Sequence, residues 1–257
     1  MKAAAAHNAR DLKVLFRTEW KLFNRVKANY IYAVFVPLML MLALKFSQDQ
    51  MKLADDNLKA GPVMVSTSVG ILLVFSLYSF ITGLYVLRRE ELVLKRLRTG
   101  EVSDPVILAG GASMYIVVCI VQILAVTTGV SLIFSTAPHQ PLTALLGILT
   151  GLALMTVMAA ATAALCKTAE SVTIATLPAI FLLPMISGVY IPREILPNAL
   201  ADVLLFAPLS PTVDLVRSGW TQNLDTAGIL ARLLLAAAWT ALFAWIAARK
   251  FRWEPRT

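Results

Sequence analysis

Two adjacent glutamates, Glu90 and Glu91, are the residues with the clearest potential for chemistry in this chain. Paired carboxylates can hold a metal ion or activate water when histidines complete the site. The chain has two histidines, His7 near the N-terminus and His139 in a proline-flanked turn, and neither belongs to an H-E-x-x-H motif. A G-x-S-x-G motif is also missing. The sequence therefore predicts no catalytic site.

Nucleotide and nucleic-acid binding are equally disfavoured. The chain lacks the G-x-x-x-x-G-K-[ST] pattern of a phosphate-binding loop. Its net charge of +8 comes from basic residues at both termini and in one internal loop, without a basic module that carries aromatic residues. Cys119 and Cys166 both lie in apolar helical stretches, which favours buried thiols over a disulfide or a metal site.

The composition is that of an integral membrane protein. Hydrophobic residues make up 58% of the 257 positions and charged residues 15%, and the mean hydropathy is +0.74. A soluble domain is about half apolar and a quarter charged. A bilayer accommodates the excess if segments of about 20 apolar residues can cross it as helices.

Six such segments occur, and we expect an all-α fold with six transmembrane helices. Pro37 interrupts the first, and Pro178 and Pro184 interrupt the fifth. Gly110-Gly111, at the start of the third, is assigned to helix packing. The domain division is a tail at 1–29 and one transmembrane domain at 30–257. The predicted spans are residues 30–46, 62–87, 106–135, 142–166, 171–190 and 227–248.

The distribution of Lys and Arg orients these spans. With the N-terminus inside, the inner segments hold 17 of these residues and the outer loops hold 5. Inner loops of membrane proteins carry such an excess. Both termini are therefore predicted to be cytoplasmic, and Trp253 in the C-terminal tail suits anchoring at the interface.

Residues 10–28 form a different kind of helix, with apolar residues on one arc and basic residues on the other. Arg17 and Lys21 belong to the basic face. This pattern predicts a helix that lies in the membrane interface, with its basic face toward anionic headgroups. Glu19 falls within the apolar arc, where it is either partly exposed by snorkelling or paired with a basic loop nearby.

Two loops are long enough to contain structure of their own. The inner loop 88–105 alternates basic and acidic residues with leucines between them, which predicts a short, exposed, charged docking helix. A second helix should open at Ser103-Asp104-Pro105. The outer loop 191–226 combines prolines with apolar patches, and we expect short helices there that dip into the outer leaflet.

Three stretches in this order resemble motifs of the ABC type-2 exporter permeases. Residues 89–100 (REELVLKRLRTG) are similar to R-E-x-G-T-L-x-R-L-R, with Leu92 where Gly is usual. Residues 183–192 (LPMISGVYIP) are similar to L-P-x-x-x-S-G-x-x-x-P. Residues 206–217 (FAPLSPTVDLVR) are similar to N-P-L-T-x-x-V-D-x-x-R, with Ala207 where Asn is usual. The motif positions of the last two stretches are Ser187, Gly188, Pro208, Asp214 and Arg217.

The resemblance implies the permease subunit of an ATP-driven exporter in a bacterial plasma membrane. Two separate ATPase subunits would bind ATP and Mg²⁺, and a second copy of this chain or a paralogue would complete the pathway within membrane lipid. This chain would hold no cofactor. Its inner loop would be the coupling helix, with Glu19 as a possible partner for Arg96 or Arg98. The residues assigned to coupling are Arg89, Glu90, Glu91, Lys95, Arg96, Arg98, Thr99, Gly100, Glu101 and Asp104.

Spans two and five resemble the pair that lines the dimer interface in that family. Their hydroxyl groups are candidates for lining the pathway, or they bond their own backbone and join helices instead. An apolar pathway with scattered hydroxyls suits an amphiphilic drug, antibiotic or lipid. The candidates are Ser76, Ser79, Thr82, Thr173 and Thr176.

Two further classes remain as alternatives. A proton-coupled carrier would need ionisable residues in mid-span, which the predicted spans lack. Glu90-Glu91 with the basic residues after them also resembles the E-E-x-x-x-R element of intramembrane CAAX-type proteases. Those enzymes need F-x-x-x-H and a second membrane histidine, whereas Phe134 and His139 have a different spacing. A membrane receptor would need a signalling domain or a ligand-like constellation, and the sequence has neither.

Overall fold

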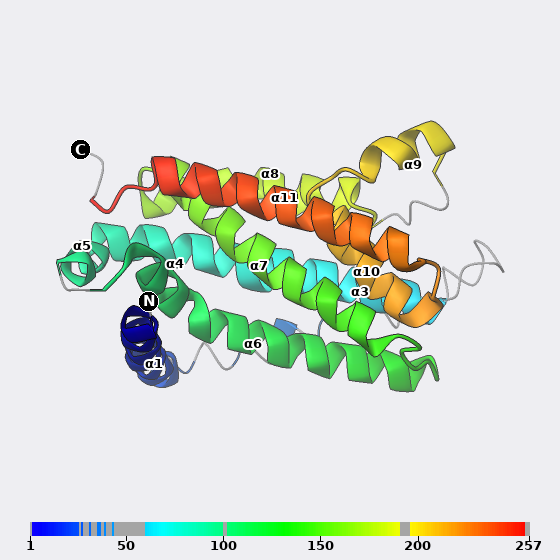
Figure 1. Cartoon of the computed structure of the whole chain (residues 1–257), viewed down its shortest axis with the longest axis horizontal. Coiled ribbons are helices and arrows are strands. Elements are labelled where there is room, and N and C mark those ends of the chain that lie inside the picture. The colour runs from blue at the N-terminus through cyan, green and yellow to red at the C-terminus, as the bar shows by residue number, and fades with distance from the viewer. Residues whose placement is uncertain are drawn as a thin grey trace.

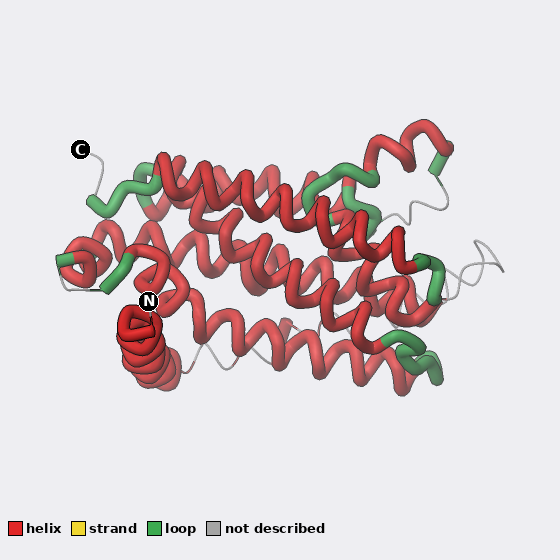
Figure 2. The backbone as a smooth tube through the Cα atoms, in the orientation of Figure 1, coloured by secondary structure: helices red, strands yellow, loops and turns green. Residues whose placement is uncertain are grey.

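The computed structural model describes residues 2–25, 27, 31, 35–36, 39, 43, 60–99, 102–190 and 196–254. The first predicted span, residues 30–46, lies largely outside these residues, as do Gly100 and Glu101. All regular structure in the described part is helical. Loops gather at the two ends of a bundle of long helices (Figure 2).

Five helices of the described part are long and apolar enough to cross a membrane. They are Ala60–Glu90, which joins α3 (Ala60–Leu72), the π-helix η1 (Leu73–Tyr78) and α4 (Ser79–Glu90), and then α6 (Asp104–Ile133), α7 (Pro141–Leu165), α8 (Ala169–Ile186) and α11 (Thr226–Lys250). They match the second to sixth predicted spans, and the expectation of an all-α integral membrane fold is confirmed.

Two predicted boundaries are wrong. The second span continues as α4 to Glu90, three residues beyond its predicted end, because the charged residues there find partners in neighbouring helices instead of water. The fifth span ends at Ile186 because Gly188 adopts a positive φ of 73°, a conformation that glycine tolerates and that stops the helix.

Close packing around α7 holds the bundle together. Gly147 and Gly151 let the helix approach its neighbours, since a Cβ at Gly147 would lie 2.8 Å from the backbone nitrogen of Val216. A Cβ at Gly151 would lie 2.5 Å from a methyl group of Leu73. Small residues of this kind allow membrane helices to pack closely.

The outer surfaces of α8 and α11 are apolar and exposed. Ile174 on α8 keeps 74% of its surface accessible, and Leu234 on α11 keeps 63%. Such surfaces require lipid or another protein chain to cover them. The polar ends of the bundle, not its sides, face water.

Helix α1 (Lys2–Arg25) crosses one end of the bundle and is seen nearly end-on in Figure 1, where the long helices run across the view. It packs on α6, where Gly110 leaves room for Leu15. Arg17 and Lys21 are exposed, as predicted for the basic face, and α6 covers only part of the apolar face. This arrangement fits a helix that lies in the interface.

Two short helices, α9 (Asn198–Leu204) and α10 (Ser210–Thr221), occupy the predicted outer loop. They lie at the opposite end of the bundle from α1 (Figure 1). Helix α9 exposes Val203, and the turn after it exposes Phe206, whereas α10 is enclosed by α3, α7 and α11. Within the described part of the outer loop, the apolar patch that could enter a leaflet therefore lies in the α9 region.

Candidate functional site

The predicted docking helix is short and is separated from α4 by a tight turn. It is α5 (Val93–Arg98), and it follows a turn at Glu91 and Leu92. Leu92 has a left-handed backbone with φ 59° and ψ 13°, which costs about 1–2 kcal/mol for a residue with a Cβ. This is the position at which the resembling motif has glycine, so the turn accounts for that preference.

The outer face of α5 is charged and the inner face is anchored. Leu94 is buried, whereas Lys95, Arg96 and Arg98 are exposed, as is Glu91 in the preceding turn. Arg98 Nε also lies 3.3 Å from Asp104 Oδ1 at the start of α6. The exposed charges have the position that the sequence predicts for a docking element. At the end of α5, the Thr99 hydroxyl donates to its own helix.

Arg89, one of the residues assigned to coupling, does not belong to this exposed face. Its side chain is completely buried and points at the C-terminus of α7. Nη1 donates to the Ala163 carbonyl at 3.0 Å, and Nη2 donates to the carbonyls of Cys166 and Lys167 at 2.6 and 3.2 Å. The guanidinium thus satisfies carbonyl groups that the end of a helix leaves unpaired.

Glu90 is half-buried and contacts the next helix. Its Oε1 accepts a hydrogen bond of 2.9 Å from the Ala169 backbone nitrogen at the N-terminus of α8. A carboxylate is stabilised there by the unpaired N–H groups and by the positive end of the helix dipole. Arg89 and Glu90, adjacent in α4, therefore bind the two sides of the α7–α8 turn (residues 166–168).

Glu19 on α1 pairs with Arg88, which directly precedes Arg89 and Glu90 in α4. Glu19 Oε2 and Arg88 Nη2 lie 2.5 Å apart, and the Glu19 and Arg88 side chains keep 8% and 11% of their surface exposed, respectively. The hypothesis of a salt bridge is confirmed, but the predicted partners Arg96 and Arg98 are wrong because α4 extends far enough to carry Arg88 under α1. Gly111 leaves space for the guanidinium, since a Cβ there would lie 2.9 Å from Arg88 Nη1. The packing role of Gly110-Gly111 is confirmed.

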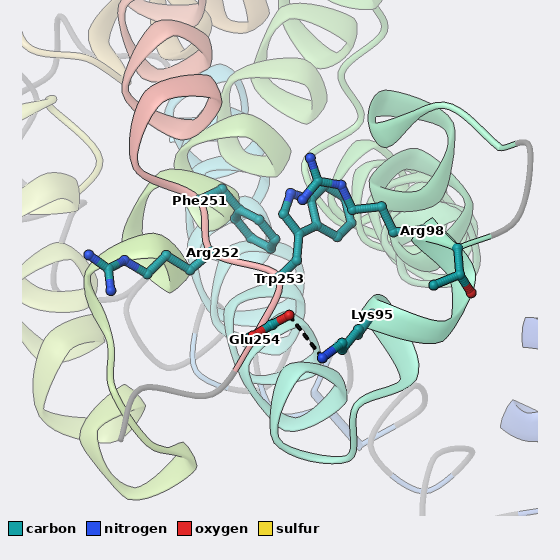
Figure 3. Close-up of a pocket in the computed structure, with 7 residues that line it drawn as sticks. Lys95, Arg98, Phe251, Arg252, Trp253 and Glu254 are labelled. Atoms are coloured by element: carbon teal, nitrogen blue, oxygen red, sulfur yellow. Dashed lines mark ion pairs between the residues drawn. The ribbon is translucent and has the colours of Figure 1, made fainter.

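The segment after α11 folds back onto α5, a contact that sequence reasoning missed (Figure 3). Lys95 Nζ lies 2.9 Å from Glu254 Oε1, and the Arg98 guanidinium stacks 5.1 Å from the centre of the Trp253 ring. These groups line an open pocket of about 600 Å³. Trp253 therefore packs on the Arg98 guanidinium of α5, a contact that the prediction of interface anchoring did not include. The acidic Glu254 after the last span is the sequence feature that could have indicated an ion pair with the basic inner loop.

A second pocket, of about 660 Å³, opens on the side of the bundle between the α3–α4 span and α8, and we call it the lateral pocket. Phe75 and Phe80 contribute to its apolar wall, and described residues of the first predicted span complete it. Of the predicted pathway residues, Ser79, Thr173 and Thr176 line this pocket.

The other two pathway candidates lie away from it. Ser76 is buried and donates to Gln122 Oε1 on α6 at 2.5 Å, and Thr82 donates to the Tyr78 carbonyl at 2.7 Å. Ser79 and Thr176 also donate to carbonyls of their own helices. The alternative reading, in which the hydroxyls bond backbone or join helices, therefore describes four of the five candidates.

The widened turn of η1 lies at this pocket. Ser79 donates to the Val74 carbonyl five residues earlier, at 3.1 Å. Phe75 and Ile71, within and just before η1, belong to the pocket wall. Segments of π-helix inside α-helices frequently mark functional sites.

The remaining motif residues tie the end of α8 to other helices. Arg217 on α10 is buried and donates to the Gly188 carbonyl and to Ser66 Oγ on α3, both at 3.2 Å. Thr67 donates to the Val189 carbonyl at 2.8 Å. The Ser187 side chain beside them is fully buried. The second motif is therefore a packing junction.

The third motif also joins helices. Asp214 on α10 accepts from Arg232 Nε on α11 at 2.9 Å, and both side chains are largely buried. Pro208 is half-buried in the turn before α10. These contacts explain how α10 and α11 remain joined at the end of the bundle that lies opposite α1.

The geometry gives no support to the protease alternative. Glu90 ends α4 beside α1, whereas His139 lies in the α6–α7 turn at the opposite end of the bundle (Figure 1). Within the part of the chain that the structure describes, no three metal-ligating side chains form a group.

A comparison with known families gives a match over most of the chain. Residues 10–220, from α1 to the end of α10, match the model of the ABC-2 type transporter family. A comparison with curated proteins gives no match.

Proposed function

The chain belongs to the ABC-2 type transporter family of membrane permeases, and we propose that it is the membrane subunit of an ATP-driven exporter of amphiphilic molecules. The family supplies the transport component of such systems and is not itself catalytic. The observation that carries the proposal is the continuity of one polypeptide segment. A single helix from Ala60 to Glu90 lines the lateral pocket and leads directly into the exposed, charged α5.

Two ATP-binding subunits would dock on α5. Lys95, Arg96 and Arg98 face outward and would fit an acidic cleft, whereas buried Leu94 keeps the helix attached to the bundle. ATP and Mg²⁺ belong to those subunits in this scheme. Closure of the pair on ATP would displace α5 as a rigid body, and the rest of the span would move with it.

The second half of the pathway would come from another copy of this chain or from a paralogue. The open side of the pocket faces outward between the α3–α4 span and α8, where Phe75 and Phe80 are partly exposed. A partner placed there would enclose an apolar cavity with a few hydroxyl groups, among them Thr173 and Ser79. Such a cavity favours a drug, an antibiotic or a lipid-like molecule over a sugar or an ion.

We place α1, α5 and the C-terminal segment on the cytoplasmic side of a bacterial plasma membrane. The structure puts these three elements at one end of the bundle (Figure 1), and the excess of Lys and Arg is at that same end. Loops with such an excess remain inside during insertion. Transport would then run from the α5 end toward the α9 end.

Co-purification tests this proposal. The chain is expressed with candidate ATPase subunits of the same genome, solubilised gently and assayed for ATP hydrolysis and for efflux of a fluorescent amphiphile from vesicles. We expect R96E to reduce hydrolysis and efflux together, and K250E, which reverses another exposed basic residue at the end of α11, to leave both intact. Efflux that needs a proton gradient but no ATPase subunit would refute the proposal in favour of a carrier.

A further inference from the structure

Arg89 and Glu90 hold the α7–α8 turn from its two sides, and this is their main contact in the described structure. Arg89 donates to the carbonyl groups of Ala163 in the last turn of α7 and of Cys166 and Lys167 just beyond it, and Glu90 accepts from the first residue of α8. The turn itself is three residues long, so α7, α8 and the end of α4 meet within one small region. None of the contacts involves the outer face of α5.

The chemistry of the pair suits a rigid joint. A guanidinium offers a planar fork of donors, and here two of its nitrogens reach three carbonyl groups at the end of α7, two of them through buried hydrogen bonds. A lysine could supply the charge but not this fork. Glu90 adds a charge-assisted bond at the opposite end of the turn. The joint is polar, directional and shielded from water at Arg89.

Helix α8 has a second fixed point at its far end. There the Val189 and Gly188 carbonyls accept hydrogen bonds from Thr67 on α3 and Arg217 on α10. Between the two fixed points α8 exposes an apolar surface and lines the lateral pocket through Thr173 and Thr176. A displacement of the α4 end would therefore reach a helix of the pocket through the joint at Ala169.

We propose that Arg89 and Glu90 are positioning residues that form a clamp, through which movement of α5 is passed to the α7–α8 turn and so to α8. The clamp divides the first motif into two mechanical parts. Residues before Leu92 fix α4 to the turn, and residues after it form the outward face. The transmission of movement through the clamp rests on the proposed function. The hydrogen bonds that form the clamp are present in the chain without any partner subunit.

The chain carries its own reporter for this joint. Cys166 lies in the turn, where its carbonyl accepts from Arg89, and its thiol is buried. Cys119 is buried in the middle of α6, away from the turn, and serves as the internal reference. Labelling by a membrane-permeant maleimide in membranes that contain the full chain therefore reports opening of the turn separately from opening of the bundle.

In the chain alone, we expect R89Q to raise the labelling rate of Cys166 by roughly tenfold or more, while Cys119 stays unlabelled. That factor corresponds to the loss of one charge-assisted hydrogen bond from a buried site. R89K should give an intermediate rate, because one ammonium group cannot replace the fork. An unchanged rate at Cys166 would overturn the clamp. Equal rises at both cysteines would also overturn it, because Arg89 would then hold the whole bundle.

The transmission is tested in the assembled complex. Trapping the ATPase subunits in their closed state with vanadate should change the Cys166 rate in the wild-type chain. In E90Q, which loses the charge at Ala169, ATP hydrolysis should continue while the change at Cys166 falls at least severalfold. A full response in E90Q would overturn the transmission. If no complex assembles, the proposed function fails, but the labelling result on the chain alone still decides the clamp.

Discussion

The ion pair between Glu19 and Arg88 allows a quantitative test of how α1 is held. Both side chains are about nine-tenths buried, and the pair joins α1 to the end of α4. Two unit charges 4 Å apart interact by about 4 kcal/mol at an effective dielectric constant near 20. Removal of one partner of a buried pair costs about 3–5 kcal/mol because the other charge is left uncompensated.

We expect E19Q and R88Q each to lower the free energy of unfolding by about 3 kcal/mol, the lower end of that range, because the pair lies at the end of the bundle. The double variant should cost much less than the sum of the two, because no unpaired charge remains. A double-mutant cycle should then give a coupling energy of about 2–4 kcal/mol. Glutamine keeps the shape of Glu19, so the change is mainly in charge.

Unfolding of the purified chain in mild detergent, followed by tryptophan fluorescence, measures these values. Trp20 lies one residue from Glu19 and is partly exposed, so its emission also reports release of α1. E91Q is the matched control, since Glu91 is exposed in the α4–α5 turn and should change stability by less than about 0.5 kcal/mol. Additive effects of the two single variants, with coupling below about 0.5 kcal/mol, would refute the reasoning.

Three further predictions concern the turn, the C-terminal segment and α8. L92G should raise the free energy of unfolding by up to about 1 kcal/mol, because relief of the left-handed strain exceeds the added chain entropy, and L92A should give no such gain in the same assay. E254Q should lower the ratio of transported substrate to hydrolysed ATP because it removes the ion-pair partner of Lys95, and E254D should keep that ratio near the wild-type value; an unchanged ratio in E254Q would exclude the ion pair as a contributor. P178A should stabilise α8 by about 3 kcal/mol, since an interior proline lacks its N–H, and should slow efflux; unaltered efflux would show that α8 does not bend there.

The order of elements could be predicted from sequence because it depends on hydropathy alone. Segments of about 20 apolar residues fix the described spans, and Pro105 and Pro141 at helix starts fix two of the boundaries. The amphipathic pattern of α1 also predicts its place at one end of the bundle. These are local properties, so they need no knowledge of neighbouring helices.

The partners of individual charges could not be predicted in the same way. Arg89 and Arg96 belong to one alternating run in the sequence, yet the first is fully buried and the second is exposed. Only the position of the α7 C-terminus, 74 residues away along the chain, supplies the carbonyl groups that allow Arg89 to be buried. Similarly, the sequence indicates the loop that pairs with Glu19 but not the arginine, because the partner depends on where α4 ends.

The left-handed residue Leu92 explains how one short motif serves two purposes. In an uninterrupted helix through residues 79–98, Arg96 would lie seven residues after Arg89 and so on the same face, which would direct Arg96 inward as well. The break at Leu92 lets α4 end where its last residues meet α7 and α8, and lets α5 start in a new direction with Leu94 as its anchor. The burial of one part and the exposure of the other are thus consequences of the same turn. A glycine at this position would form that turn with less strain, so the chain accepts strain in Leu92 that the resembling motif avoids.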